Sequence, residues 1–537
     1  MAILSHHRFW TIIGSLAIII LFTLFLHNRL TTIPDADAFY HIRHSWIYSQ
    51  NGVTFNEFPW TQFSAIKQRA ADLWYGFHIL SLPLIYFFKD LITGIRVGGA
   101  LVTITTLVLV WFSLKRLNIR GPLFWTLAFA FLSADVLYRI TMFRPHSISV
   151  GLSLLLFSFF AMPAKSKNWL WIILVSFGFS WIHISLIWVP IVVWLAVNFA
   201  RHIGKLSVGW QSGIAMVSGL ILGWLARPNP LGAAKLAYIQ VLKLLVEKQA
   251  NLPIRFGREL KPFVWENFAD QLIPVCILLV LAISIWLWVY FKNKNAVPPI
   301  ETRLISMASF IISAGFLALS FLVARRANDF FIPFAVIFIA VTYDGFLRIN
   351  RQTVLESARP IILLIAAVAL IWAPLKNFYR FETYVPNAFP AEKFKDVGEW
   401  MRENLPDQTT VFNPQWDRFG ELFFWNYESY YINGMDPIFE YAYNPTLYWK
   451  THYIHTDSFY ISDGVAKICG NPKCERTDVE DIYSILKRDF NASYLFLEKH
   501  RNPKLFEYLE SPAMAGQAAV GFEKLYDSEI ATVYKIN

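Results

Sequence analysis

The chain has 537 residues, of which 55% are hydrophobic, 17% are aromatic and only 16% are charged. Soluble domains carry about a quarter of charged residues, so this composition excludes an ordinary soluble protein and predicts a polytopic membrane protein. Residues 1–379 have a net charge of +18 and residues 380–537 a net charge of −8, so the basic part is the apolar part and does not indicate a nucleic-acid partner.

Apolar segments close to the length of a membrane-spanning helix recur along the basic part of the chain. We expect eleven spans, at about 9–27, 93–114, 122–138, 146–162, 168–183, 184–200, 209–226, 270–291, 304–323, 329–346 and 360–378. Residues 74–88 are apolar but short and contain Pro83, so we interpret them as a helix lying on the outer surface. The sequence therefore predicts a transmembrane domain at 1–379, with outer loops at 28–92 and 227–269, and a soluble domain at 380–537.

The basic residues indicate how these spans are oriented. Lys and Arg gather in alternate connections, and the short connections on the other side hold only Arg139, Arg144, Arg325 and Arg326. Because basic connections stay in the cytoplasm, the N-terminus is predicted to be cytoplasmic in an integral cell-membrane protein. Both outer loops and the C-terminal domain are then predicted to be extracytoplasmic.

Two carboxylates, Asp35 and Asp37, follow the first predicted span closely. Acidic side chains at the water edge of a membrane are costly unless they bind something. A divalent cation, Mn²⁺ or Mg²⁺, that faces a phosphate is the usual partner of such carboxylates. The alternative role is a helix cap or a loop turn, since Pro34 and Asp35 precede a predicted helix.

Residues 37–43, Asp-Ala-Phe-Tyr-His-Ile-Arg, resemble the D-x-aromatic-aromatic-(Asn/His)-x-Arg element of the first outer loop in oligosaccharyltransferase catalytic subunits. These subunits belong to the GT-C class of polytopic glycosyltransferases, which use lipid-linked sugar donors. The resemblance implies that Asp37 binds a metal ion and contacts the acceptor. Asp35 has no firm counterpart in that family.

The second outer connection, residues 138–147, departs from the family pattern. Arg139 matches a family arginine, but the acidic pair that completes the family's metal site is missing, and His146 stands in place of its first carboxylate. Histidine binds Mn²⁺ or Zn²⁺ but suits Mg²⁺ poorly. Either the metal site has fewer ligands than in the family, or Arg144 and His146 contact phosphate directly. The second arrangement would resemble GT-C enzymes that use polyprenyl monophosphate sugars without a metal.

Arg325 and Arg326 lie at the outward end of a predicted span, against the positive-inside pattern. A guanidinium group presents a planar fork to phosphate oxygens, and charges at a membrane edge are functional candidates. The family has an Arg-Phe…Pro element here that holds the lipid-linked phosphate, which implies this role for Arg326. An ion pair with Asp329, or an extension toward the lipid headgroups, is the alternative.

The start of the C-terminal domain also resembles the family. Residues 399–406 and 411–420 follow the order found in the family, which is Trp, Arg-Glu-Asn, a buried strand and then a W-W-D-Y-G motif. In the family, the W-W-D-Y-G motif recognises the Ser or Thr hydroxyl of the acceptor. Trp416 and Asp417 match this motif, Gln415 replaces its first Trp, and one extra residue precedes Gly420. The resemblance implies that Trp416 and Asp417 bind the acceptor, and a structural Trp at a strand end is the alternative.

The rest of the C-terminal domain predicts a mixed α/β fold. Helical patterns at 392–403 and 478–487 alternate with short apolar strands at 410–412, 494–497 and 531–534. Cys469 and Cys474 bracket Gly-Asn-Pro-Lys and are able to form a disulfide if that side of the membrane is oxidising. Two reduced thiols are the alternative.

The sequence thus predicts a GT-C-like membrane glycosyltransferase that moves a sugar or oligosaccharide from a polyprenyl-(di)phosphate donor to a protein, glycan or lipid acceptor at the outer face. Asp37 and Asp35 would be catalytic, and a divalent metal would lie on Asp37, Asp35 and His146. The donor phosphate would lie on Arg326, Arg325, Arg144 and Arg139. Two alternatives remain, a GT-C transferase that uses a polyprenyl-monophosphate sugar and a non-enzymatic transporter or lipid-binding membrane protein.

Overall fold

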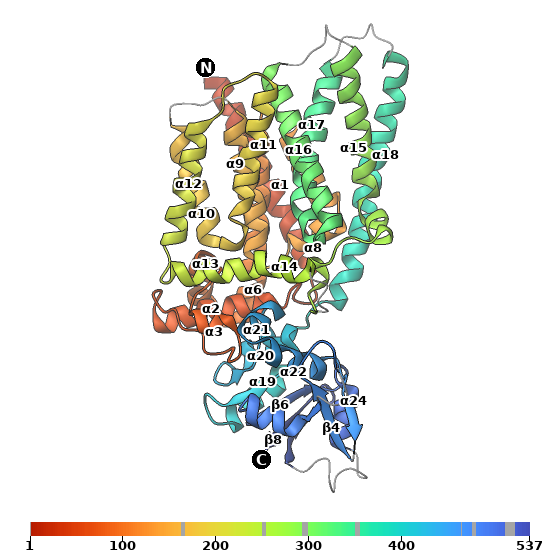
Figure 1. Ribbon diagram of the computed structural model, residues 1–537. Coiled ribbons are helices and arrows are strands. Elements are labelled where there is room, and N and C mark those ends of the chain that lie inside the picture. Colours follow the sequence, from red (N-terminus) through yellow and green to blue (C-terminus); the bar gives the residue numbers. More distant parts are fainter. Residues whose placement is uncertain are drawn as a thin grey trace. The chain divides into compact units, whose positions relative to one another are not determined.

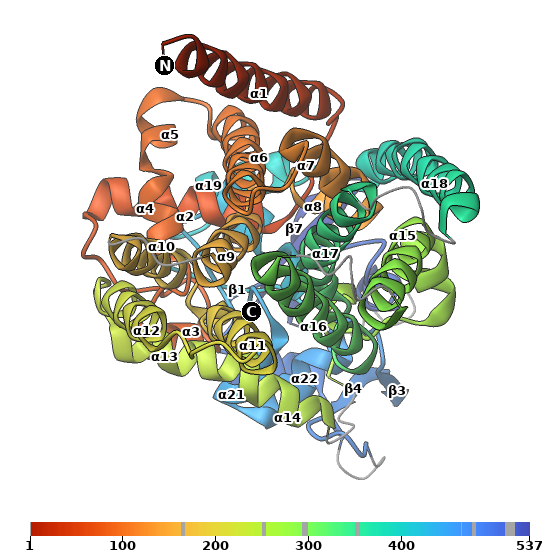
Figure 2. The ribbon, with the colours of Figure 1, turned by 90° about the horizontal axis from the view of Figure 1, so that it is seen from above.

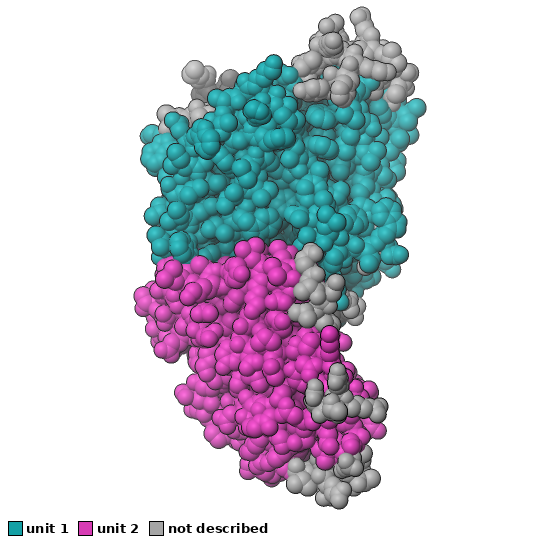
Figure 3. All heavy atoms as spheres, in the orientation of Figure 1, with its two compact units in different colours: residues 1–34, 96–226, 257–388 teal, residues 35–95, 227–256, 389–537 magenta. Residues whose placement is uncertain are grey.

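The computed structural model describes residues 2–162, 167–249, 254–292, 299–348, 355–462, 464–474, 479–510 and 521–537. The chain forms two compact units, which Figure 3 shows in teal and magenta. Unit 1 comprises Met1–Pro34, Arg96–Ala226 and Gly257–Ala388, and unit 2 comprises Asp35–Ile95, Arg227–Phe256 and Phe389–Asn537. Each unit therefore gathers segments that are far apart in the sequence.

Unit 1 is a bundle of helices, most of which run nearly parallel to one another (Figures 1 and 2). They are α1 Ala2–Asn28, α6 Leu91–Arg116, α7 Pro122–Phe131, α8 Ala134–Arg139, α9 Pro145–Ala161, α10 Asn168–Ile182, α11 Trp188–Ile203, α12 Trp210–Leu225, α15 Trp265–Lys292, α16 Ile300–Leu322, α17 Asn328–Arg348 and α18 Leu355–Tyr384. Helix α10 packs on α12, α16 packs on α17, and α15 contacts both α17 and α18.

Seven of the described helices are long and apolar enough to cross a membrane. They are Phe9–Asn28, Leu91–Arg116, Ile184–Ile203, Gln271–Val289, Ile300–Leu322, Arg325–Leu347 and Arg359–Tyr384. The other predicted spans are helical but short, at Pro122–Phe131, Pro145–Ala161, Asn168–Ile182 and Trp210–Leu225, with 10–17 residues each. The prediction of a mostly helical, multi-pass membrane protein is confirmed, whereas the count of eleven spans is not.

Close approach of two helices in unit 1 depends on glycine. Gly219 and Gly223 lie one turn apart on α12, and a Cβ atom at either position would overlap a backbone carbonyl oxygen of α10, that of Ile173 or that of Phe177. Small residues spaced by four allow backbones to pack closely where lipid gives no hydrophobic driving force between helices. This pair explains how two short apolar helices hold together.

Unit 2 combines helices with two β-sheets. Its first segment forms α2 Asp37–Asn51, α3 Ala65–Arg69, α4 Tyr75–Leu80 and α5 Leu82–Phe87, and its second forms α13 Pro230–Tyr238 and α14 Leu244–Gln249. Its third segment forms α19 Lys395–Asn404, β1 Thr410–Phe412, α20 Phe419–Trp425, β2 Tyr430–Tyr431, α21 Pro437–Tyr443, α22 Pro445–His455, β3 Tyr460–Ser462, β4 Val465–Cys469, β5 Val479–Asp481, α23 Ile482–Ser484, β6 Tyr494–Glu498, α24 Pro503–Glu510, β7 Phe522–Asp527 and β8 Ala531–Ile536.

The larger sheet has the strand order β2-β1-β6-β8-β7. Strand β1 pairs in parallel with β2 and β6, and β8 pairs antiparallel with β6 and β7. Leu495 and Leu497 of β6 lie fully buried in the core that this sheet shares with the surrounding helices. The predicted mixed α/β character of the C-terminal region is therefore confirmed.

Two details of this region differ from or extend the sequence analysis. The predicted helix at 478–487 is wrong at its start, because residues 479–481 form β5, which pairs antiparallel with β4 in the sheet β3-β4-β5. Sheet pairing with β4 outweighs the local helical pattern at that point. Cys469, at the end of β4, forms a disulfide with Cys474.

Glu440 on α21 is a carboxyl group in the core of unit 2, with only 2% of its surface exposed. Its Oε1 accepts a hydrogen bond from Thr451 Oγ1 at 2.6 Å, and its Oε2 accepts one from Asn433 Nδ2 at 2.7 Å. Burial raises the pKa of Glu440 to about 8, and these two hydrogen bonds only partly offset that effect. The folded protein therefore binds this proton more tightly than the unfolded chain does.

This proton linkage predicts a pH-dependent stability. The protonated carboxyl stabilises the fold fully below the unfolded pKa of 4.5, and this contribution is lost as the pH rises through the folded pKa of about 8. We expect the thermal unfolding midpoint of the purified protein to fall from about pH 6 to about pH 9, and to fall less in Glu440→Gln. The exposed Glu403→Gln should keep the wild-type slope. Identical slopes in wild type and Glu440→Gln would contradict this assignment.

Candidate functional site

Helix α2 carries the acidic motif. Asp37 is the first residue of the helix, and the N-cap position is occupied by Ala36 rather than by Asp35. Asp37 is half-buried, whereas Asp35 is buried with 5% of its surface exposed. A carboxylate in the first helical turn is favoured by the partial positive charge of the helix N-terminus. The start of α2 is therefore a favourable position for Asp37.

The segment around Trp416 and Asp417, which resembles the family's acceptor motif, packs directly on α2. Residues 416–418 form a short 3-10 turn that leads into α20, and Phe424 of α20 stacks edge-on against Phe39 of α2. A Cβ atom at Gly420 would lie 2.6 Å from the backbone oxygen of Ala36. Glycine at 420 therefore permits the approach of α20 to the backbone that positions Asp35 and Asp37.

Trp416 and Asp417, the predicted acceptor-binding pair, are both half-buried in unit 2. Asp417 Oδ2 accepts a hydrogen bond from Arg501 Nη2 at 3.1 Å. The extra residue of the motif, Arg418, turns inward and donates to Glu498 and Glu421 at 2.9 and 3.1 Å. Arg418 therefore belongs to the buried ion pairs of the domain, which explains how one additional residue fits before Gly420.

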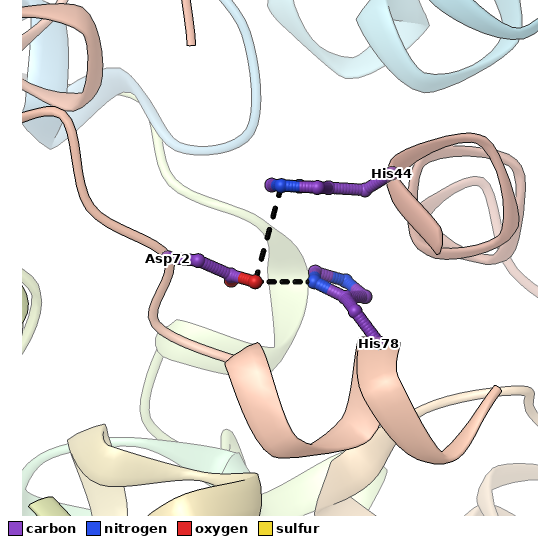
Figure 4. A group of neighbouring side chains, drawn as sticks. All are labelled: His44, Asp72 and His78. Carbon is purple, nitrogen blue, oxygen red and sulfur yellow. Dashed lines mark hydrogen bonds and ion pairs between the residues drawn. The ribbon is translucent and has the colours of Figure 1, made fainter. Parts of the chain in front are cut away.

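Two histidines lie beside an aspartate in unit 2 (Figure 4). His44 of α2, Asp72 of the loop before α4 and His78 of α4 each direct one ligand atom to a common point, and these atoms lie within 4.8 Å of one another. His78 Nδ1 lies 2.6 Å from Asp72 Oδ2, and His44 Nε2 lies 3.9 Å from the same oxygen. Among the residues that the structure describes, this is the group suited to holding a metal ion.

The surroundings of this group fit a metal site. The outer nitrogens of both rings are held by hydrogen bonds, His44 Nδ1 by Tyr40 Oη at 2.8 Å and His78 Nε2 by His41 Nδ1 at 2.8 Å. Such partners orient ligating imidazoles in known metal sites. Burial lowers the pKa of His44 to about 3, so its imidazole is neutral and carries a lone pair. Two imidazoles and one carboxylate suit Zn²⁺ or Mn²⁺ better than Mg²⁺.

Asp72 is the anion of this group. Burial by itself raises the pKa of Asp72, but His78 and the backbone N–H of Trp74 hold it well below its usual value. Tyr48 Oη donates to Asp72 Oδ2 at 3.0 Å, and the Trp74 N–H donates to Oδ1 at 2.8 Å. The carboxylate is therefore ionised and fixed in position. None of the three predicted metal ligands, Asp35, Asp37 and His146, belongs to this group.

Unit 1 contains a cluster of charges at the ends of α8, α9 and α17. Three of the four predicted phosphate-binding arginines converge on Glu259, with Arg139 Nη1 at 2.7 Å, Arg144 Nη1 at 3.6 Å and Arg326 Nη1 at 3.2 Å. Burial by itself raises the pKa of Glu259, but these arginines hold it well below its usual value. We call these four residues the arginine cluster. It presents three guanidinium groups to one carboxylate.

Asp329 is a second carboxylate beside the arginine cluster. Its Oδ2 lies 2.9 Å from Arg139 Nε and 2.6 Å from His146 Nε2. His146 therefore contacts a carboxylate of its own unit. Arg325, the fourth predicted arginine, instead makes a bidentate ion pair with Asp135, with nitrogen–oxygen distances of 2.5–2.8 Å.

The sequence predicted the cations of this cluster and Asp329 as a possible ion-pair partner, but it did not indicate Glu259 or Asp135. Glu259 lies in a short 3-10 turn, and Asp135 lies at the start of α8. The available signal was that both acidic residues fall on the predicted outer side of the membrane, where Arg139, Arg144, Arg325 and Arg326 also lie. In unit 2, His44 and Asp72 were also not singled out from the sequence.

Comparisons with known proteins give the fold. The structure resembles the oligosaccharyltransferase of Archaeoglobus fulgidus, solved in complex with Zn and sulfate, with a TM-score of 0.54 and 12% identity over 97% of this chain and 73% of that chain. It also resembles the arabinofuranosyltransferase AftD from Mycobacteria, with a TM-score of 0.52 and 13% identity over 97% of this chain and 41% of that chain. No protein-family model and no curated protein matches the sequence.

These similarities establish a GT-C-like fold, the class of polytopic membrane proteins to which both of the solved structures belong. The fold expected from residues 37–43 is therefore confirmed. This chain spans less than half the length of AftD, and at this level of identity the activity of either protein does not transfer by similarity.

The contact between Gly420 and Ala36 predicts the effect of a single added methyl group. In Gly420→Ala the methyl group would clash with a backbone oxygen, which cannot rotate away, so α20 and the start of α2 must separate. We expect a destabilisation of about 1–3 kcal/mol and a lower thermal unfolding midpoint. Gly178→Ala is the matched control, because no atom lies within 4 Å of its added methyl group. Equal midpoints for the two variants would refute the close approach.

Proposed function

We propose that this chain is a membrane glycosyltransferase that moves a sugar or oligosaccharide from a polyprenyl-(di)phosphate donor to an acceptor at the outer face. The observation that carries the proposal is the arginine cluster, found in a fold shared with two glycosyltransferases. Displacement of a polyprenyl phosphate from the anomeric carbon leaves negative charge on the phosphate. Preorganised cations are the groups that stabilise such charge.

Arg326, Arg139 and Arg144 are the residues we assign to the donor phosphate. Their guanidinium groups already share one acceptor, Glu259, and a phosphate brings more acceptor oxygens and more negative charge than a carboxylate. A phosphate oxygen would replace the carboxylate as their partner. We assign Arg325 to positioning rather than to phosphate, because its Nε and Nη2 already donate to both oxygens of Asp135.

Asp37 is the carboxylate that we assign to the acceptor or to a divalent cation. It lies in the first turn of α2 and is partly accessible. Asp35, which is buried, would support the same motif. Trp416 and Asp417 lie on the segment that packs on the start of α2 and are proposed to contact the acceptor. A bound cation would supply electrostatic stabilisation of the leaving phosphate.

The proposed reaction face is extracytoplasmic. The Cys469–Cys474 disulfide supports this orientation, because disulfides persist in oxidising compartments. The positive-inside distribution supports it independently. In this orientation the N-terminus is cytoplasmic and the C-terminal region faces outward.

A donor with a single phosphate is the second candidate. The connection at 138–147 lacks the acidic pair of oligosaccharyltransferases and offers Arg139, Arg144 and His146 instead. Similarity to an arabinofuranosyltransferase supports a glycan acceptor as an alternative to a protein. Mono- and diphosphate donors differ in charge, and competition between them distinguishes the two candidates.

The test is a transfer assay with the full chain in lipid nanodiscs. Polyprenyl-diphosphate oligosaccharide and polyprenyl-monophosphate sugar are offered separately, each with a peptide carrying Asn-x-Thr and with a glycan acceptor, and the product is detected by mass spectrometry. Transfer from either donor supports a glycosyltransferase. Binding of donors without transfer to any acceptor would favour the non-enzymatic lipid-binding alternative.

Arg326 should control donor affinity. In Arg326→Ala the phosphate loses one charge-assisted hydrogen bond, worth about 1.5–3 kcal/mol, so the dissociation constant of the donor should rise about tenfold to a hundredfold. Arg326→Lys should recover only part of the loss, because lysine lacks the planar fork. Arg120→Ala, with a side chain 62% exposed, is the control and should bind donor normally. Unchanged donor affinity in Arg326→Ala would exclude the assigned role.

Asp37 should control the rate of transfer. Asp37→Asn keeps the size of the side chain but removes its charge, and transfer should fall by about two orders of magnitude, with folding and donor binding largely retained.

A chelator should abolish transfer if a metal takes part, and Mn²⁺ should restore it. Metal content then locates the ion. An ion on Asp37 is lost from Asp37→Asn and retained in His78→Asn, and the opposite result assigns it to His44, Asp72 and His78. Full activity in chelator would exclude a catalytic metal.

A further inference from the structure

Unit 2 contains an open groove of about 520 Å³ that the proposed reaction does not use. Its walls come from the C-terminal half of α2, the end of α5, the start of α6, and α19 and α20 with the residues that follow. Three cations, Arg43, Lys89 and Arg402, lie among aromatic side chains in this lining. The groove lining therefore combines positively charged side chains with aromatic rings.

Arg43 is the buried member of these cations, with 7% of its surface exposed. Its guanidinium carbon lies 4.7 Å from the ring centre of Tyr427, 4.9 Å from that of Trp46 and 5.1 Å from that of Phe424. Its Nη2 donates to the backbone oxygen of Phe424 at 2.5 Å. No carboxylate of the described residues forms an ion pair with it. Rings and one carbonyl compensate only part of the cost of burying a charge.

Two buried hydrogen-bond donors of the groove lining lack an acceptor. Arg43 Nε and Trp425 Nε1 are buried and have no hydrogen-bond partner within the described part of the chain. Both groups only donate, so a ligand has to supply the acceptor. The single carboxylate of the lining, Asp90, accepts from the N–H groups of Ile92 and Thr93 at 3.1 and 3.0 Å and so caps α6. The groove is therefore complementary to an anion.

The chain itself places this groove at the membrane surface. Lys89, Asp90 and Leu91 line the groove, and Leu91 is the first residue of a helix long and apolar enough to span the membrane. Tyr86 and Phe87, which directly precede them, are 72% and 81% exposed. Exposed aromatic residues at the end of a span are typical of the interface where lipid headgroups lie.

We propose that this groove binds the anionic headgroup of a membrane phospholipid. The phosphate would contact Arg43 and Arg402, Lys89 would contact the outer part of the headgroup, and the aromatic rings would cover its apolar portion. A phospholipid headgroup, a free phosphate and a polyprenyl-linked donor all offer a phosphate anion. We assign the anion in this groove to a phospholipid, whose apolar portion lies beside its phosphate. The inference depends on the membrane location of α6 and not on glycosyl transfer.

The test uses the delipidated full chain in detergent and measures retained lipid by native mass spectrometry. Phosphatidylglycerol is titrated against phosphatidylcholine for the wild type and for the double variant Lys89→Gln, Arg402→Gln. We expect one tightly retained phosphatidylglycerol, and about thirtyfold weaker retention in the double variant, since each basic group near an anionic lipid contributes about a fivefold factor. Lys473→Gln, an exposed lysine elsewhere in unit 2, should retain phosphatidylglycerol as the wild type does.

Thermal unfolding midpoints equal to that of the wild type would show that the variants are folded, and binding should weaken with added salt. Equal retention of phosphatidylcholine would overturn the proposal, as would wild-type retention in the double variant.

Two competition experiments separate the other sources of phosphate. Complete displacement by inorganic phosphate would mean a free-anion site, and displacement by equimolar polyprenyl-linked donor would assign the groove to the donor; either result overturns the phospholipid assignment.

Discussion

A buried cation at the end of an apolar helix has to find its anion within the protein, and the arrangement of unit 1 depends on this constraint. Arg139 ends α8, Arg144 precedes α9 and Arg326 precedes α17, and all three meet at Glu259. Removing the common carboxylate would leave three like charges close together. These ion pairs therefore link the ends of three helices through one carboxylate.

The elements of the fold were largely predictable, because composition and periodicity act locally. Apolar runs predicted the helices of unit 1, although not the number of spans, and short apolar stretches between turn residues predicted β1, β6 and β8. Breaks inside apolar runs were not predictable in the same way. The predicted span at 122–138 is interrupted between Phe131 and Ala134, and residues 479–481 join a sheet because β4 lies beside them. Such breaks depend on neighbours distant in the sequence.

The candidate site was predictable only on its cationic side. Arg139, Arg144 and Arg326 were conspicuous because they violate the charge asymmetry of membrane proteins. Their partners carry no local signal, since Glu259 is 120 residues from Arg139, and Asp135 is 190 residues from Arg325. His44, Asp72 and His78 were hidden for a related reason. They lie in an aromatic-rich loop whose composition is typical of a membrane interface, and only tertiary folding brings their ligand atoms together.

The arginine cluster of unit 1 and the arginines of the groove in unit 2 also differ in the interactions that an incoming anion has to displace. At the arginine cluster a phosphate would take over guanidinium groups that already hold Glu259, so its binding would exchange one anion for another, with a net free energy smaller than the contacts alone indicate. An exchange of this kind is suited to a donor whose phosphate must leave after each transfer. At the groove of unit 2, Arg43 has rings and a carbonyl but no carboxylate of the described residues to give up. An anion there gains an uncompensated cation, which is suited to a lipid that stays bound.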